Sequence, residues 1–356
     1  MKRNIFIYIL MLFTVCTNAQ QERIYIQELT VVPGGEMDYI TVAIENGAYD
    51  DYTGFQFDLV LPPGLELAYD EGYIDSDNDV KGYLCRKHNL DIAVKNEYIR
   101  FICYSGDNST FSKKSGNLIN IGVVPTAYLK PGDIEIKLMN VKFARETVEY
   151  GFKADELSLA GITAEPTSSL TLKVSANNKF STTVLPFDIP QIPNGLEVYS
   201  CNSISGESII LQKQNSIAAY TPYILYAPNG FEGTLSGAVD EKMYSETVSD
   251  GFLTGTVVNT EIGGGNGHYV MQNKGEGPMF YKVDDTTFSI PAGKCWLTLP
   301  NELQKSPMLR FGDTTGIDNV TVRNNAGSPD SYDLQGRMAR NAINGIYIVN
   351  GKKIIK

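Results

Sequence analysis

The chain is short of the residues on which most acid–base and metal chemistry in proteins depends. Its 356 residues include two histidines, five cysteines and one tryptophan. A Ser-His-Asp or Cys-His site needs a histidine base, and zinc sites draw mainly on histidine and cysteine. His88 and His268 are far apart in the sequence, and neither stands in a nucleophile motif. The neighbours Arg86, Lys87 and Asn89 predict a solvated loop around His88. We therefore expect neither a histidine-based hydrolase nor a zinc enzyme.

Basic residues and long apolar runs are also scarce. Forty-one acidic and 30 basic side chains give a formal net charge of −11. Such a negative field repels phosphate backbones, which argues against a nucleic-acid partner. Beyond the N-terminal region no segment is apolar and long enough to cross a bilayer, so we expect no membrane span in the mature chain.

The N-terminus has the pattern of a secretory signal. Lys2 and Arg3 precede an apolar run over residues 5–15, and small or polar residues follow at 17–19. The run is too short to span a membrane unaided. The pattern predicts a signal peptide at residues 1–19, cut after Ala19, and hence a secreted protein.

Four cysteines remain after the signal: Cys85, Cys103, Cys201 and Cys295. An exported protein permits disulfides. The domain division given below would pair Cys85 with Cys103 and Cys201 with Cys295. The alternative is that all four are small, buried apolar side chains, and the sequence leaves both open.

Apolar and polar residues alternate with a period of two along much of the chain, as in half-buried strands. Phe55, Phe57 and Leu59 fall on one face of such a strand. Asn-Gly pairs, which favour tight hairpin turns, recur throughout, and sustained helical periodicity is almost absent. The sequence predicts an all-β protein of sandwich or barrel type.

The chain divides into four pieces after the signal. We predict a β-sandwich at 21–174 with a closing strand at 169–174, and a β-rich middle domain at 179–304. A polar linker follows at 305–331. We predict two hairpins in the tail at 332–356, which is too small to bury a core of its own.

The first piece resembles the cohesin and carbohydrate-binding-module sandwiches, a jelly-roll-like group. The resemblance implies a non-catalytic module that binds either a dockerin-type protein or a polysaccharide. The segments that carry it are residues 40–46, 54–62, 100–105, 116–118 and 132–141.

The tail resembles the C-terminal sorting domain of the Bacteroidota type IX secretion system, on the basis of residues 332–337 and 344–353. This resemblance implies passage through the outer membrane and attachment or release at the cell surface. An ordinary terminal hairpin is the alternative. The middle piece resembles a β-rich module of secreted proteins from the same bacteria, for which no activity is assigned.

An acidic run invites a calcium interpretation. Asp75, Asp77 and Asp79 alternate with polar residues, and such oxygens can surround a hard cation. An EF-hand loop would require glycine and an acid where Val80 and Arg86 stand, so only a looser structural calcium site survives. A solvated acidic loop is the alternative.

Tyrosines are abundant, 21 in all. Tyr49, Tyr52, Tyr69 and Tyr73 lie among acidic residues, where aromatic faces and carboxylates could form a sugar platform. Tyr69 and Tyr73 are the predicted ligand-binding residues. The alternative is that these rings pack at the sandwich edge with wet hydroxyls.

Together these patterns predict an exported, non-catalytic protein of the outer-membrane surface or extracellular space. Its N-terminal sandwich would bind a protein partner or a polysaccharide. One alternative is a structural or adhesin subunit of the surface. Another is a glycoside hydrolase with an unrecognised pair of carboxylates.

Overall fold

The computed structural model describes residues 22–68, 80–147, 150–205, 208–265, 267–273, 278–283 and 286–299, together with five strands further along the chain. The predicted signal peptide lies outside these residues. Within them the regular structure is β-strand apart from two short 3-10 turns, η1 (Tyr83–Cys85) and η2 (Glu241–Met243). The all-β prediction is confirmed. No helix in this described part is long and apolar enough to cross a membrane.

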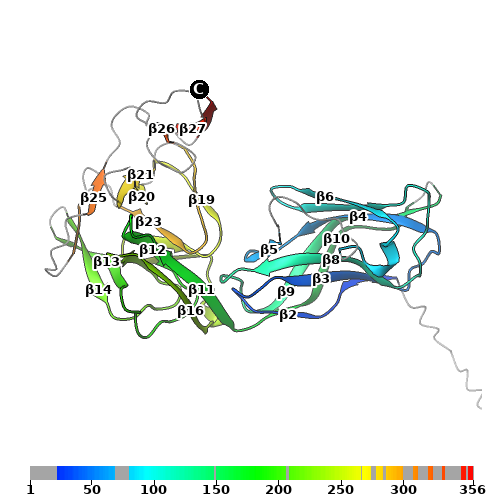
Figure 1. Cartoon of the computed structure of the whole chain (residues 1–356), viewed down its shortest axis with the longest axis horizontal. Coiled ribbons are helices and arrows are strands. Elements are labelled where there is room, and N and C mark those ends of the chain that lie inside the picture. Colours follow the sequence, from blue (N-terminus) through cyan, green and yellow to red (C-terminus); the bar gives the residue numbers. More distant parts are fainter. Residues whose placement is uncertain are drawn as a thin grey trace, which may run out of the picture.

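The first part of the chain is a sandwich of two sheets (Figure 1). One sheet has the order β1 (Arg23–Ile26), β3 (Asp38–Glu45), β8 (Gly116–Pro125) and β5 (Leu65–Leu67). The other has the order β2 (Leu29–Val31), β10 (Tyr150–Ala164), β9 (Gly132–Arg145), β4 (Tyr52–Val60), β7 (Ile99–Tyr104) and β6 (Asn89–Val94).

The sandwich core forms because the alternating residues of both sheets point inward. In β4, Phe55, Phe57 and Leu59 are at most 3% exposed, as the alternation predicts. Opposite them, Ile40 and Val42 of β3 belong to the same apolar cluster. Each strand therefore has one face in the core, and the alternate side chains form the outer face of its sheet.

The second part of the chain is built on a long mixed sheet. Its order is β12 (Phe180–Val184), β15 (Pro222–Tyr226), β13 (Glu197–Ser205), β14 (Ser208–Gln214), β24 (Met308–Phe311), β25 (Val320–Arg323), β21 (Pro278–Lys282), β20 (His268–Asn273), β23 (Lys294–Thr298), β18 (Leu253–Thr256) and β17 (Thr247–Asp250).

This sheet curls, so that its first strand meets strands near its other end. The Cys295 N–H donates to Thr182 Oγ1 at 3.0 Å, and the Val184 N–H donates to the Gly293 carbonyl at 3.1 Å. Three smaller sheets accompany it. They are β11 (Thr167–Val174) with β16 (Phe231–Ala238), β19 (Thr260–Ile262) with β22 (Phe288–Ile290), and β26 (Ser331–Tyr332), β27 (Ile346–Val349) and β28 (Lys352–Ile355).

Two expectations about strand placement are wrong. The strand at 169–174 does not close the first sandwich, because β11 pairs with β16 along its whole length and its Leu172 and Val174 enter the second core. The segment at 305–331 is not only a linker, since β24 and β25 lie within it and join β14 to β21. The division into domains otherwise stays a prediction.

One tyrosine of the first sandwich is buried in the core of the second part. Tyr128, on the connection between β8 and β9, is 8% exposed and belongs to the second apolar cluster. Its hydroxyl donates to the Val184 carbonyl at 3.1 Å. Nearby, Lys130 pairs with Glu241 at 3.1 Å, and the Ser168 hydroxyl donates to the Ala127 carbonyl at 2.8 Å. The two parts therefore share apolar and polar contacts.

We expect Tyr128→Ala to destabilise the chain by about 3 kcal/mol, because truncating a buried aromatic ring leaves a cavity. Denaturant unfolding followed by fluorescence would measure this loss. The variant should also separate the unfolding of the two parts into two transitions. Tyr39→Ala, at a site that is 47% exposed, serves as the control and should change stability by less than about 0.5 kcal/mol. Equal losses of stability in Tyr128→Ala and Tyr39→Ala would contradict the proposed packing of Tyr128 in the second core.

Candidate partner-binding face

The outer face of the six-stranded sheet carries three cross-strand rows of side chains from β7, β4 and β9. The register places Tyr104 beside Gly54 and Ala144 in one row. The next row holds Ile102, Gln56 and Lys142, and the third holds Arg100, Asp58 and Met139. Tyr150 of β10 lies beside Ala144 and extends the first row. We call the nine residues and Tyr150 the β4-centred face. They lie opposite the core-facing phenylalanines because successive residues of a strand alternate between its faces.

A buried carboxylate lies in the third row. Asp58 is 1% exposed although it points away from the sandwich core. Arg100 binds it with two hydrogen bonds, Nε to Oδ1 at 2.6 Å and Nη2 to Oδ2 at 2.7 Å. Asn140 Nδ2 donates to Oδ2 at 2.8 Å. A bidentate guanidinium and an amide thus satisfy the carboxylate, and together they fix three strands relative to one another.

The Arg100 hydrogen bonds are the largest influence on the pKa of Asp58, and they hold it below its usual value. Burial acts in the opposite direction, and Asn140 and Lys142 reinforce the lowering. The same contact raises the pKa of Arg100. The guanidinium also lies 5.3 Å from the centre of the Tyr98 ring, within range of a cation–π contact. Asp58 and Arg100 are therefore both charged at neutral pH.

Asn140 reaches the carboxylate because β9 contains a bulge. The partners of β9 along β4 shift between Gln56 and Asp58, and Asn140 has a φ of 53°. Asparagine tolerates this left-handed conformation better than most residues. The bulge inserts an extra residue opposite β4, and such irregularities redirect side chains. Here the redirected amide completes the ligation of Asp58.

Two exposed tyrosines lie at the two ends of the first row. Tyr104 is 42% exposed and Tyr150 of β10 is 50% exposed, and the register places them on either side of Gly54 and Ala144. The Lys153 and Lys142 ammonium groups lie 4.8 and 5.9 Å from the centre of the Tyr150 ring. Half-buried Ile102 and Met139 lie further along the face. Tyrosine, arginine and methionine are the residues that protein interfaces favour.

The predicted calcium and sugar residues are only partly accounted for. Asp75, Asp77 and Asp79, and Tyr69 and Tyr73, fall outside the described residues, so those proposals stay predictions. Among the described residues no group of three His, Cys, Asp or Glu side chains could hold a metal ion.

The two remaining tyrosines of the sugar hypothesis do not form an open platform. Tyr52 is 2% exposed, and its hydroxyl donates to Glu22 at 2.8 Å. The Arg145 guanidinium lies 3.9 Å from the centre of the Tyr49 ring and covers one of its faces. The alternative, rings packed at the edge of the sandwich with wet hydroxyls, fits Tyr49, which is 38% exposed. It does not fit Tyr52, which lies in the core and whose hydroxyl also accepts from the Phe152 N–H at 3.2 Å.

The four cysteines are buried, and the structure describes them as free thiols. A hydrogen bond with Cys103, together with burial, raises the pKa of Cys85. The two thiols are therefore neighbours, on η1 and β7. Cys201 and Cys295 both lie in the second core, where burial raises the pKa of Cys295 to about 12. The disulfide pairing stays a prediction.

Neither histidine lies on the β4-centred face. His88 is 2% exposed and packs edge-on against Phe111, with ring centres 5.3 Å apart. It is not the solvated loop residue that its charged neighbours predicted. His268 Nδ1 is 3.3 Å from the Gly263 carbonyl. Its ring centre lies 6.2 Å from that of Trp296.

Sequence reasoning missed the Asp58 network. The only available signal was that a charged residue occupies an outward position of a strand whose inward positions are apolar, and a solvated side chain gives the same pattern. Arg100 and Asn140 lie 42 and 82 residues further along the chain. The strand pairing that brings all three together cannot be read from local alternation.

Comparison with known proteins gives structural matches only. No family model and no curated protein matches the chain. Among solved structures, a cohesin from Archaeoglobus fulgidus matches at 17% identity over 40% of this chain and 88% of its own, with a TM-score of 0.29. The seventh ScaB cohesin of Pseudobacteroides cellulosolvens matches at 15% identity over 40% of this chain and 92% of its own, with a TM-score of 0.32. A chain of a cohesin–dockerin complex from Clostridium thermocellum matches at 13% identity over 40% of this chain and 99% of its own, with a TM-score of 0.32. The sandwich itself is established by the strand order described above.

We expect Arg100→Met to destabilise the chain by about 2 kcal/mol at neutral pH, because it leaves the buried Asp58 charge with Asn140 alone. Asp58 has a lowered folded-state pKa, so its contribution is present above its unfolded pKa of about 3.9 and is lost as pH falls through the folded value. The difference between variant and wild type should therefore shrink in acid. Denaturant unfolding at several pH values measures it.

Arg86→Met is the matched control, because Arg86 is exposed and its guanidinium lies over the exposed Tyr83 ring, 5.4 Å from the ring centre. It should change stability by less than about 0.5 kcal/mol. An Arg100→Met protein as stable as this control at neutral pH would contradict the network.

The buried His88 predicts a loss of stability in mild acid. Burial is the largest influence on its pKa and lowers it, while the Ser109 backbone and Asp107 oppose this and Lys81 adds to it. The unfolded chain, with a histidine pKa of about 6.5, therefore binds a proton first as pH falls. Stability should decrease below that pH by up to about 1.4 kcal/mol per pH unit and level off below the folded pKa.

His88→Phe removes the titrating imidazole and keeps a ring against Phe111. The stability of this variant should therefore not change between pH 7 and about pH 5, a range above that in which carboxylates titrate. Unfolding curves across this range give the comparison. A wild-type protein that is equally flat would show that His88 titrates normally.

Proposed function

We propose that this chain is an exported, non-catalytic surface protein that binds a partner protein through the β4-centred face. The observation that carries the proposal is the combination of a fixed charge network with exposed aromatic and half-buried apolar side chains on one sheet face. Arg100 and Asn140 are held by Asp58, so little side-chain entropy is lost when a partner covers them. Tyr104 and Tyr150 supply the large, rigid contacts that dominate binding energies.

Export and surface attachment belong to the same proposal. They rest on the charged and apolar N-terminal pattern of residues 1–19 and on the type IX-like tail at 332–356. The resemblance of residues 21–174 to cohesin and carbohydrate-binding modules leaves protein and polysaccharide as ligand classes. We favour a protein, because a sugar platform needs several open aromatic faces. Of the two described tyrosines of the sugar hypothesis, Tyr52 is buried, and Tyr49 is 38% exposed with Arg145 over one face.

The test is capture by the immobilised full chain from envelope and culture fractions of the organism that carries it. Wild type is compared with a double variant, Tyr104→Glu with Tyr150→Glu. A matched double variant, Met37→Glu with Tyr39→Glu, alters two residues of the other sheet region that are 49% and 47% exposed. We expect one protein to be retained by wild type and by the Met37/Tyr39 variant and to be lost from the Tyr104/Tyr150 variant.

With the retained protein purified, titration calorimetry should show at least about 30-fold weaker binding to the Tyr104/Tyr150 variant, the loss expected of one interface hot spot. Equal retention by all three chains would contradict the proposed face. Retention on insoluble polysaccharide that depends on neither pair of residues would favour the polysaccharide alternative.

A further inference from the structure

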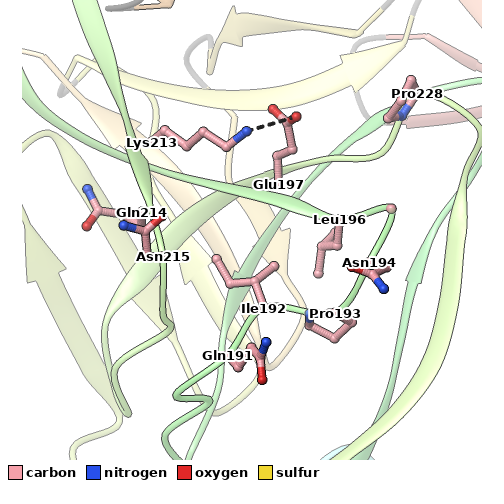
Figure 2. A pocket seen from close by; sticks show the side chains of 11 residues that line it. Gln191, Ile192, Pro193, Asn194, Leu196, Glu197, Lys213, Gln214, Asn215 and Pro228 are labelled. Atoms are coloured by element: carbon pink, nitrogen blue, oxygen red, sulfur yellow. Dashed lines mark ion pairs between the residues drawn. The ribbon is translucent and has the colours of Figure 1, made fainter.

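A hollow in the second part of the chain lies between the 191–196 loop and the adjoining ends of β13 and β14, at Glu197 and residues 213–215 (Figure 2). Pro228 closes another side. Its volume is about 350 Å³, which is at the lower end of the range for small-molecule sites. The hollow is far in sequence from the β4-centred face and shares no residue with it.

The charges around this hollow cancel each other. Lys213 Nζ lies 3.0 Å from Glu197 Oε1, and the Tyr199 hydroxyl also donates to Glu197. Burial acts to raise the pKa of Glu197, but the hydrogen bonds from Tyr199 and Lys213 outweigh it and the pKa is lowered. No other charged residue is among the described residues that line the hollow. A neutral ligand therefore suits it better than an ionic one.

Uncommitted side-chain amides surround the hollow. Gln191, Asn194 and Asn215 are exposed, and their side chains make no hydrogen bond to any residue in the described part of the chain. Gln214 is fixed instead, because its amide donates to Ser200 Oγ at 2.9 Å and to the Gln212 carbonyl at 3.1 Å. Each free amide offers two donor hydrogens and one acceptor oxygen.

Apolar surface lies among these amides. Figure 2 shows Ile192 and Leu196 between Asn215 on one side and Asn194 on the other, with Pro193 beside them. Leu196 is buried and Ile192 half-buried. The hollow therefore offers both C–H surface and amide groups.

We propose that this hollow binds a neutral saccharide. Sugar hydroxyls are donors and acceptors at once, so they match primary amides, and the C–H face of a pyranose ring suits aliphatic and proline side chains. A peptide that adds a strand fits less well, since β13 is already paired with β14 and β15, and β14 with β13 and β24. The proposal is independent of the partner-binding face.

The experiment uses the full chain and a panel of neutral disaccharides, maltose, cellobiose, lactose and diacetylchitobiose. Ligand-observed saturation-transfer NMR detects binding, and titration calorimetry gives affinities. We expect at least one disaccharide to bind, and Asn215→Ala and Gln191→Ala each to weaken it about three- to ten-fold, the effect of losing one or two hydrogen bonds. Asn177→Ala is the matched control, because Asn177 is an exposed amide of the same part of the chain that does not line the hollow.

Three results would overturn the proposal. One is no binding of any disaccharide in the panel at millimolar concentration. Another is binding that Asn177→Ala weakens as much as the two pocket variants do. The third is loss of sugar binding in a variant of the first part, such as Tyr104→Glu with Tyr150→Glu. That loss would place the sugar on the β4-centred face instead. None of these depends on whether a protein partner is captured.

Discussion

The Asp58 carboxylate is the constraint from which the character of the β4-centred face follows. A buried charge is costly unless its oxygens are bonded, and here Arg100 and Asn140 provide three hydrogen bonds from two other strands. The three hydrogen bonds constrain the register of β7, β4 and β9 on their outer side, and the packed phenylalanines constrain it on the inner side. A sheet face held in this way is rigid before any partner arrives, which lowers the entropy lost on binding.

The sandwich and the second part are connected through their interiors as well as through the chain. Tyr128, between two strands of the first sandwich, packs in the second core. Strand β11, which follows the sandwich in the chain, pairs with β16. Burial of an aromatic ring across the junction makes the orientation of one part depend on the integrity of the other.

Local pattern sufficed for the strands but not for their partners. The alternation around Phe55 and Phe57 correctly predicted a half-buried strand, because the alternation within a strand shows which of its side chains face the core. The strand at 169–174 has the same alternation, but which sheet it joins depends on pairing with residues about 60 positions away, as its bond between Thr171 and Thr234 illustrates. The burial of Asp58 was missed for the same reason, because Arg100 and Asn140 reach it only through the pairing of distant strands. His88 was misjudged because charged sequence neighbours do not determine burial.

The most direct test of the account is site-specific photo-crosslinking in the full chain. A photoreactive amino acid in place of Ile102, in the middle row of the β4-centred face, is compared with the same amino acid in place of Tyr39 on the other sheet. The account predicts a covalent adduct with one protein from the envelope or culture fraction for position 102 and none for position 39. Adducts of equal yield at both positions, or a protein adduct at position 39 alone, would contradict it.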